Sequence, residues 1–257
     1  MSEHVRVESN GGVLAITLAR PERRNAITVA MYAALAEAVE QAQLDPALRV
    51  IALRGEGEDF TAGNDLGDFL AAMPRDGEEI PVWRLLRALA GNALPLVAAV
   101  HGNAVGIGTT LLLHCDLVLA EEGTRFLMPF ADLGLVPEAA SSLLLPRLAG
   151  RRRAARYLLL GESFGAEEAR EWGLVSTVVA KGKLGDAMNA TVAALLAKPA
   201  TALRLTQSLL RQGNRDEILE RMELENGHFS ERLQSADVKE AITAFFEKRK
   251  PDFSSRG

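Results

Sequence analysis

Three segments combine small residues with polar groups in arrangements that could stabilise an oxyanion or move a proton. The first is FTAGNDLGDF, residues 60–69, in which Ala62-Gly63 precedes the turn-forming pair Asn64-Asp65. Small residues let a ligand approach the backbone closely, and a free N–H at such a turn can point at a developing oxyanion. Taken alone, an ordinary glycine turn is the simpler interpretation of this segment.

The second segment is HGNAVGIGTTLLLHCD, residues 101–116. Its glycines, including Gly106 and Gly108, separate a β-prone run from an apolar helix, so the N–H groups around Ile107 are expected at a helix N-terminus, which favours negative charge. A dinucleotide-binding loop is a rival interpretation, but G-x-G-x-x-G is absent because Leu111 stands where the third glycine is needed. Taken alone, the glycines could equally serve close helix packing.

The third segment is FLMPFADLGLVPEAASSLLLPRL, residues 126–148, in which Glu138 has few charged neighbours. A carboxylate among apolar residues is expected to have a raised pKa, the condition that a general base for a weakly acidic carbon needs. The alternative is a glutamate in the first turn of the following helix, where the helix dipole favours it. The residues alone leave both interpretations open.

Composition excludes several classes of protein. The 257 residues are 48% hydrophobic and 25% charged, which is typical of a folded globular chain. The net charge of -5 argues against nucleic acid or an anionic membrane as partner. A single cysteine and four scattered histidines predict neither a disulfide nor a metal site. We find no signal peptide, transit segment or apolar run of membrane-spanning length, so we expect a cytoplasmic protein.

Strand and helix signals alternate through the first part of the chain. The expected strands are residues 13–18, 50–53, 96–100 and 117–120, and the expected helices between them are 28–43, with Thr28 as N-cap, and 109–115. This alternation predicts an α/β fold with a parallel sheet and helices packed outside it.

The later part of the chain has the pattern of helices. They are expected at residues 151–160, 166–172, 184–197, 200–211, 216–234 and 236–248. Because Lys198-Pro199 suits a helix start, we divide the chain into a core, 1–198, and a helical C-terminal module, 199–257.

Taken together, these segments resemble the crotonase, or enoyl-CoA hydratase/isomerase, superfamily. LARPERRNAI (18–27), EWGLVSTVV (171–179) and FFEKRKPDF (245–253) extend the resemblance over nearly the whole chain. It implies a spiral of ββα repeats closed by a C-terminal helical trimerisation module. It also implies an acyl-CoA thioester substrate, with CoA as part of the substrate and no separate cofactor.

The resemblance also implies roles for individual residues. The two oxyanion-hole N–H groups would come from Ala62 and Ile107. The CoA site would be lined by Ile107 and by residues of two loops, namely Arg23, Arg24, Ala26, Ala62, Gly63, Asn64, Asp65 and Leu66.

Hydratases of the family carry two glutamates that activate water, and their positions match Thr110 and Phe130 here. Neither side chain can transfer a proton as a carboxyl group does. Glu138 stands where peroxisomal-type 3-enoyl-CoA to 2-enoyl-CoA isomerases carry their catalytic carboxylate. The resemblance therefore implies an enoyl-CoA isomerase in fatty-acid degradation. The alternatives are an enoyl-CoA hydratase or other crotonase-type reaction, and a non-catalytic acyl-CoA-binding paralogue.

We also expect a homotrimer or a dimer of trimers, partly from the resemblance. The other reason is an apolar stripe near the C-terminus, formed by Ile218, Leu219, Met222, Phe229 and Leu233, which needs a surface to cover it. The sequence does not distinguish a neighbouring subunit from the chain's own core as that surface.

Overall fold

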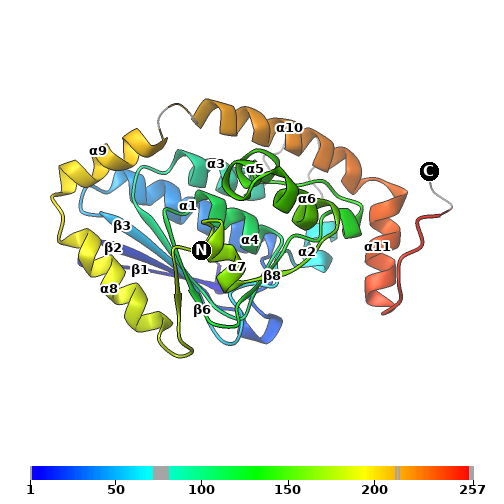
Figure 1. Ribbon diagram of the computed structural model, residues 1–257, viewed down its shortest axis with the longest axis horizontal. Coiled ribbons are helices and arrows are strands. Elements are labelled where there is room, and N and C mark those ends of the chain that lie inside the picture. The colour runs from blue at the N-terminus through cyan, green and yellow to red at the C-terminus, as the bar shows by residue number, and fades with distance from the viewer. Residues whose placement is uncertain (1, 72–80, 212, 214, 255–257) are drawn as a thin grey trace.

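The computed structural model (Figure 1) describes residues 2–71, 81–211, 213 and 215–254. A six-stranded sheet in the order β1-β2-β3-β4-β6-β9 forms its centre. The strands are β1 (Val5–Asn10), β2 (Val13–Leu18), β3 (Val50–Gly55), β4 (Leu96–Val100), β6 (Leu117–Glu121) and β9 (Thr177–Val179). All neighbours pair in parallel except β1, which forms an antiparallel hairpin with β2. The predicted parallel sheet is confirmed.

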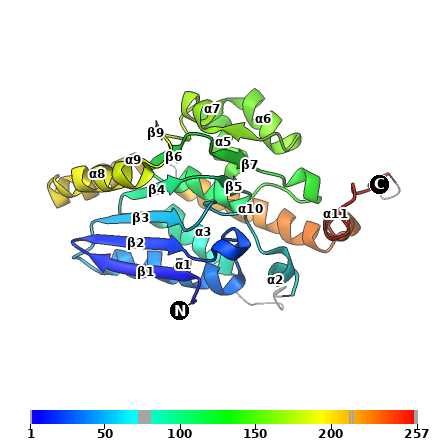
Figure 2. The ribbon, with the colours of Figure 1, turned by 90° about the horizontal axis from the view of Figure 1, so that it is seen from below.

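A second, three-stranded sheet consists of β5 (Asn103–Val105), β7 (Arg125–Leu127) and β8 (Phe164–Gly165). Figure 2 shows it lying beyond the larger sheet, on the side of α5 (Ser141–Ala149), α6 (Arg151–Leu159) and α7 (Ala166–Glu171). Between β5 and β6 the chain forms α4 (Ile107–Thr110) and a 3-10 turn, Leu111–His114. We had predicted one helix over 109–115, and the structure begins it two residues earlier and tightens its second half.

Helices cover both faces of the large sheet. On one face lie α1 (Val29–Leu44) and α3 (Pro81–Gly91), and their apolar sides join the main core. On the other face, Met188 of α8 (Leu184–Leu196) packs in a smaller core with Val50, Val97 and Leu119. Burial of apolar side chains on both faces explains why β4 is an uninterrupted apolar run.

The N-terminus of α1 is capped as the sequence predicted. The Thr28 hydroxyl accepts a hydrogen bond from the Met31 N–H at 3.2 Å, and its backbone is extended. This bond satisfies one of the amides that a helix N-terminus leaves without a partner.

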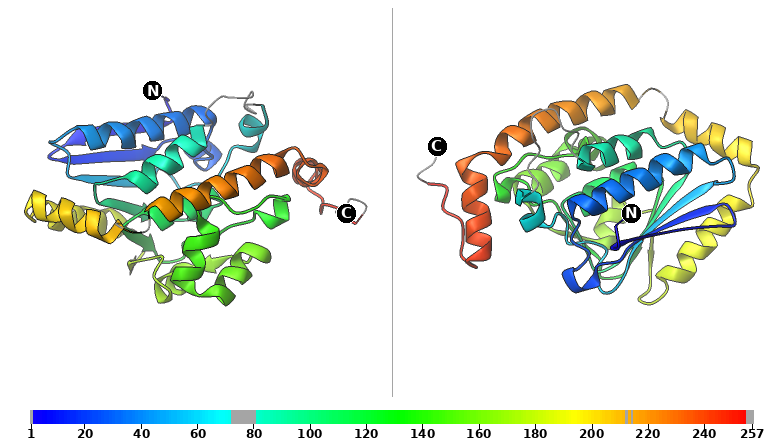
Figure 3. Two further views of the ribbon diagram at one scale, coloured as in Figure 1. Left: turned by 90° about the horizontal axis from the view of Figure 1, so that it is seen from above. Right: turned by 180° about the vertical axis from the view of Figure 1, so that it is seen from behind.

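Three helices follow α8 at the C-terminal end: α9 (Ala200–Arg211), α10 (Arg215–Leu233) and α11 (Ala236–Phe246). Figure 3 shows α10 running across the molecule over α3 and the α5 region, with α11 turning away at its end. The proposed division at Lys198-Pro199 falls between α8 and α9. The remaining helical segments are short: α2 (Leu66–Ala71) and the 3-10 turns Pro21–Arg23 and Ala131–Leu133.

The apolar stripe near the C-terminus packs on the chain's own core. Met222, Phe229 and Leu233 are buried in the main cluster, with Ile218 and Leu219 packed against it. Self-packing thus explains the stripe, which no longer argues for a subunit contact. Other leucines on these helices are exposed instead, namely Leu205, Leu209, Leu210 and Leu224. Within the described residues, no helix is long and apolar enough to span a membrane.

Candidate active site

The two glycine-containing segments predicted to hold an oxyanion lie side by side. Thr61 pairs with Ala104 in a parallel bridge, and the Val105 N–H donates to the Thr61 carbonyl at 3.0 Å. A Cβ at Gly63 would come within 2.8 Å of the Val105 carbonyl oxygen, and one at Gly108 within 2.4 Å of the Thr61 methyl carbon. These glycines therefore allow the two backbones to approach.

The Ala62 N–H is not available to a substrate. It donates to the Arg24 carbonyl oxygen at 2.9 Å. The predicted role of Ala62 as an oxyanion-hole donor is therefore wrong for this conformation, although Ala62 does line the adjacent cleft. Sequence resemblance located the segment but not the amide within it.

The free amide of this segment belongs to Asn64. The residues on either side of it bond to Ile27, whose N–H donates to the Gly63 carbonyl at 2.8 Å and whose carbonyl accepts from the Asp65 N–H at 3.0 Å. Because successive residues of an extended chain direct their polar groups to opposite sides, the Asn64 N–H faces away from Ile27. It donates no hydrogen bond within the part of the chain that the structure describes.

Ile107 supplies a second free amide. It is the first residue of α4, and Gly106 before it has a φ of 55°. The first N–H groups of a helix lack an acceptor within it, and the Ile107 N–H has none among the described residues. Both Asn64 and Ile107 line the same cleft.

This cleft has a volume of about 560 Å³. One wall comes from the loops of the two predicted CoA segments, with Arg23, Ala26 and residues 62–66 all at its surface. The opposite wall is apolar and comes largely from the helices α10 and α11, with Phe229, Leu233, Val238, Ile242, Phe245 and Phe246. Arg24 is not a lining residue; its exposed guanidinium lies 3.6 Å from the Asp59 carboxylate.

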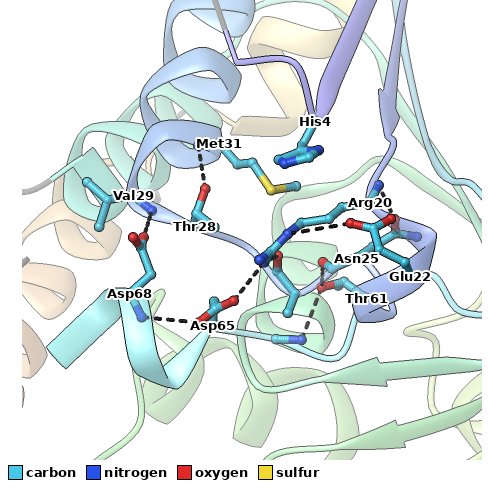
Figure 4. A network of polar contacts seen from close by, with 12 residues as sticks. His4, Arg20, Glu22, Asn25, Thr28, Val29, Met31, Thr61, Asp65 and Asp68 are labelled. Carbon is cyan, nitrogen blue, oxygen red and sulfur yellow. Dashed lines mark hydrogen bonds and ion pairs between the residues drawn. The ribbon is translucent and has the colours of Figure 1, made fainter. Parts of the chain in front are cut away.

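A polar network holds the loop that carries Asn64 (Figure 4). Arg20 donates to the Asp65 carboxylate at 2.7 Å, and Asp65 in turn accepts from the Asp68 N–H at 3.1 Å. The Asp68 carboxylate accepts from the Val29 N–H at 2.6 Å, which connects α2 to the start of α1. Burial opposes ionisation of Asp65, but its bonds from Arg20 and from backbone N–H groups outweigh this and lower its pKa. Asp65 therefore fixes this loop.

Glu138, the candidate general base, is a buried carboxyl residue. Its side chain is 1% exposed, and Oε1 has no hydrogen-bond partner among the described residues. Burial raises its pKa to about 8, the nearby Glu225 carboxylate adds to this effect, and the adjacent Thr110 hydroxyl reduces it. A carboxyl group with these properties can act as a general base near neutral pH.

Two connections place Glu138 close to the free amides. Thr110, which neighbours Glu138, lies one helical turn after Ile107, about 5 Å along the axis of α4. Tyr32 donates a hydrogen bond to the Asn64 side-chain oxygen. The pKa of Tyr32 is raised well above its usual range by burial and, in addition, by the charge of Glu138. Glu138 itself is not a lining residue of the 560 Å³ cleft.

Comparison with known proteins shows the family of the chain. The model of the enoyl-CoA hydratase/isomerase family matches residues 8–256. The chain belongs to this family. It is 35% identical to 1,2-epoxyphenylacetyl-CoA isomerase of Escherichia coli K12, and the match covers all of both chains. It is 36% identical to a probable enoyl-CoA hydratase of Rhodobacter capsulatus, again over the full length of both.

A solved structure of a family member superimposes closely. The enoyl-CoA hydratase/isomerase from Pseudoalteromonas atlantica T6c is 39% identical, with a TM-score of 0.92 over 98% of this chain and all of that one. The protein is therefore an enzyme of the enoyl-CoA hydratase/isomerase family with the crotonase fold. The names of its relatives include both hydratases and isomerases, so the reaction must be argued from the site.

The family's two hydratase positions hold no carboxyl group in this enzyme. Thr110 is fully buried, and its hydroxyl has no hydrogen-bond partner among the described residues. Phe130 is 5% exposed and lines the cleft. In addition, no cluster of three metal-ligating side chains occurs in the described part of the chain.

Sequence analysis missed several residues that contact the site. Tyr32 lies inside an ordinary amphipathic helix, and Glu225 is one of many charged residues in α10. His114 is buried, and its Nε2 donates to the Ala139 carbonyl at 2.8 Å. Nothing in the local sequence identifies these residues, because their contacts are with distant segments.

Proposed function

We propose that this enzyme converts 3-enoyl-CoA thioesters to 2-enoyl-CoA thioesters by a 1,3-proton shift. The observation that carries the proposal is the buried carboxyl of Glu138, whose pKa is raised to about 8 and whose neighbour Thr110 lies one helical turn after the free Ile107 amide. An isomerase of this kind needs one group that both removes and returns a proton. Hydration instead needs acid-base groups that organise water, and the two positions that hold them in hydratases are Thr110 and Phe130.

In the first step, Glu138 removes a proton from C2. The electron pair of the C–H bond forms a C1–C2 double bond, and negative charge develops on the thioester oxygen. The Asn64 and Ile107 N–H groups donate hydrogen bonds to this oxygen. Donors fixed in advance stabilise charge as it forms without reorganising, and each is worth about 3 to 4 kcal/mol of barrier.

In the second step the negative charge leaves the enolate oxygen as the thioester carbonyl re-forms. The C1–C2 electron pair forms the new C2–C3 double bond, the former C3–C4 double bond opens, and C4 takes the proton from the Glu138 carboxyl. Glu138 ends ionised, as it began, so no oxidant, reductant or metal enters the balance.

The cleft supports an acyl-CoA as the ligand. Arg23 stands at the surface of the loop wall, where an anionic part of CoA could bind, and the helical wall offers only carbon to the acyl group. The similarity to a relative named 1,2-epoxyphenylacetyl-CoA isomerase supports an isomerase that acts on a CoA thioester. The buried, perturbed carboxyl favours an enzyme over a non-catalytic acyl-CoA-binding protein.

The test is turnover of 3-hexenoyl-CoA by purified protein without added cofactor. We expect 2-hexenoyl-CoA as product, and loss of activity in Glu138→Gln, which keeps the size of the side chain and removes the base. Wild-type turnover by that variant would show that Glu138 is structural.

A further inference from the structure

The turn that follows Glu138 has an unusual backbone. Ala139 and Ala140 have φ values of 62° and 55°, in the left-handed region that glycine adopts readily and alanine does not. A Cβ atom in this region comes too close to the following carbonyl oxygen, so each residue is strained relative to ordinary backbone. A strained backbone beside a proposed catalytic residue persists only where other contacts impose it.

Two side chains from distant segments impose this conformation. The Glu225 carboxylate accepts hydrogen bonds from the Ala140 N–H at 2.7 Å and from the Ser142 N–H at 2.9 Å. Burial lowers the pKa of His114 to about 4, so its ring is neutral near pH 7, and Nε2 donates to the Ala139 carbonyl at 2.8 Å. The Glu138 carbonyl also accepts from the Ser141 N–H at 3.0 Å.

Glu225 has two structural roles in this arrangement. It caps the N-terminus of α5, where no side chain of the local sequence does so, and it ties the turn to α10, which lies over this region in Figure 3. Glu225 is only 5% exposed, so its contact with the turn is shielded from solvent although it comes from a distant helix. Removing it would leave two amides at the strained turn without an acceptor.

We propose that Glu225 is a positioning residue for catalysis: its two hydrogen bonds hold the left-handed turn that directs Glu138 at C2 and C4 of the substrate. This inference rests on the function proposed above for Glu138. It adds that the C-terminal helix α10 is part of the catalytic apparatus through this contact.

Charge acts in the same direction as geometry. The groups that shift the pKa of Glu138 are Glu225 and the Thr110 hydroxyl, while Glu138 itself raises the pKa of Tyr32 and His114 contacts the adjoining backbone. Burial raises the pKa of Glu225, and the hydrogen bonds from Ser142 and Ala140 and the charge of Arg221 only partly offset this. Arg221, also on α10, donates to the Ser142 hydroxyl at 3.2 Å. The negative charge of Glu225 in turn helps to raise the pKa of Glu138 and so makes it a stronger base.

The experiment compares Glu225→Gln, Glu225→Asp and the control Glu217→Gln. Glu217 lies on the same helix and joins α10 to α5 through an exposed ion pair with Arg147 at 2.6 Å, so the control weakens the same helix pair away from Glu138. For each variant, kcat and KM for 3-hexenoyl-CoA are measured from pH 5.5 to 9.5. Circular dichroism checks folding.

In Glu225→Gln we expect kcat to fall about tenfold or more with KM little changed, because a misplaced base weakens the chemical step more than binding. The acid limb of the profile, the low-pH range in which kcat rises with pH, should shift to lower pH by about one unit. The reason is that loss of the neighbouring negative charge lowers the pKa of Glu138. Glu225→Asp keeps the charge but shortens the reach, so kcat should fall while the acid limb stays near its wild-type position. The control Glu217→Gln should match wild type in kcat and in the position of the acid limb.

A Glu225→Gln profile that matches the control in kcat and in acid limb would overturn the positioning role. If Glu225→Gln does not fold, Glu225→Asp decides: a kcat equal to that of wild type would overturn the positioning role. The proposed function is judged separately by Glu138→Gln. An inactive Glu138→Gln with an unaffected Glu225→Gln removes this inference alone, whereas an active Glu138→Gln removes both.

Discussion

Replacement of Glu138 by glutamine is expected to change the pH dependence of folding stability. In the folded enzyme burial raises the pKa of Glu138 from an ordinary value of 4.5 to about 8. The folded state therefore retains this proton over a pH range in which the unfolded state releases it. For the wild-type protein, the contribution of Glu138 is most favourable below pH 4.5 and is lost as the pH rises towards 8.

The size of the effect follows from the shift. Each pKa unit corresponds to about 1.4 kcal/mol, so a shift of three to four units corresponds to roughly 4 to 5 kcal/mol above pH 8. Glu138→Gln lacks this ionisation. Its stability relative to wild type should therefore increase by that amount between pH 4.5 and 8.5. For a chain of this size the change corresponds to about 10 °C in Tm.

Thermal unfolding of both proteins at pH 5 and pH 8.5 measures the effect. Because the comparison is a difference between two pH values, any constant cost of the amide side chain cancels. We expect the Tm of Glu138→Gln minus the Tm of wild type to be larger at pH 8.5 than at pH 5. An equal difference at both values would show that Glu138 ionises normally in the folded protein and would refute the argument from burial.

Two further results are expected from the same structure, and a third, the trimer, rests on the family resemblance alone because the apolar stripe packs on the chain's own core. Hydration of crotonyl-CoA should be weak or absent, because Thr110 and Phe130 replace the two carboxyl groups; rapid loss of the enoyl absorbance with formation of 3-hydroxyacyl-CoA would contradict this. Ile107→Pro removes one oxyanion donor at a helix position that tolerates proline, so kcat should fall by about 10²- to 10³-fold. The control Ile107→Val keeps the N–H, and its kcat should stay within a few-fold of wild type. Light scattering should give a mass that is a multiple of three chains, and deletion from Pro199 onward should disrupt the assembly; a monodisperse monomer with full isomerase activity would exclude this arrangement.

Much of the fold could be predicted because its signals are local. The strands 13–18 and 96–100 are found at the predicted residues, since short apolar runs bounded by turn signals identify buried strands. The strand β1 was missed because five of its six residues are exposed, which leaves no buried face for the sequence to mark. The helix α3 follows residues 72–80, outside the described part of the chain, and its strong amphipathic pattern was not used.

The site was predicted less completely. The roles that the resemblance implies for Ile107 and Glu138 stay predictions; the structure shows a free N–H at Ile107 and a raised pKa at Glu138. The resemblance misassigned the first donor by two residues, because only the hydrogen bond from Ala62 to Arg24 shows which amide is occupied. Glu225 could not be found from sequence, since its partners lie more than eighty positions away.

The most direct test of the account is the position of the acid limb of isomerase activity and its dependence on Glu138. With 3-hexenoyl-CoA as substrate, kcat/KM should rise with pH to a plateau above about 8, because the free enzyme's base must be ionised. Glu138→Gln should have no such limb and at most residual turnover. If Glu138→Gln retains wild-type kcat/KM with the same pH dependence, another group carries the proton and the account is wrong.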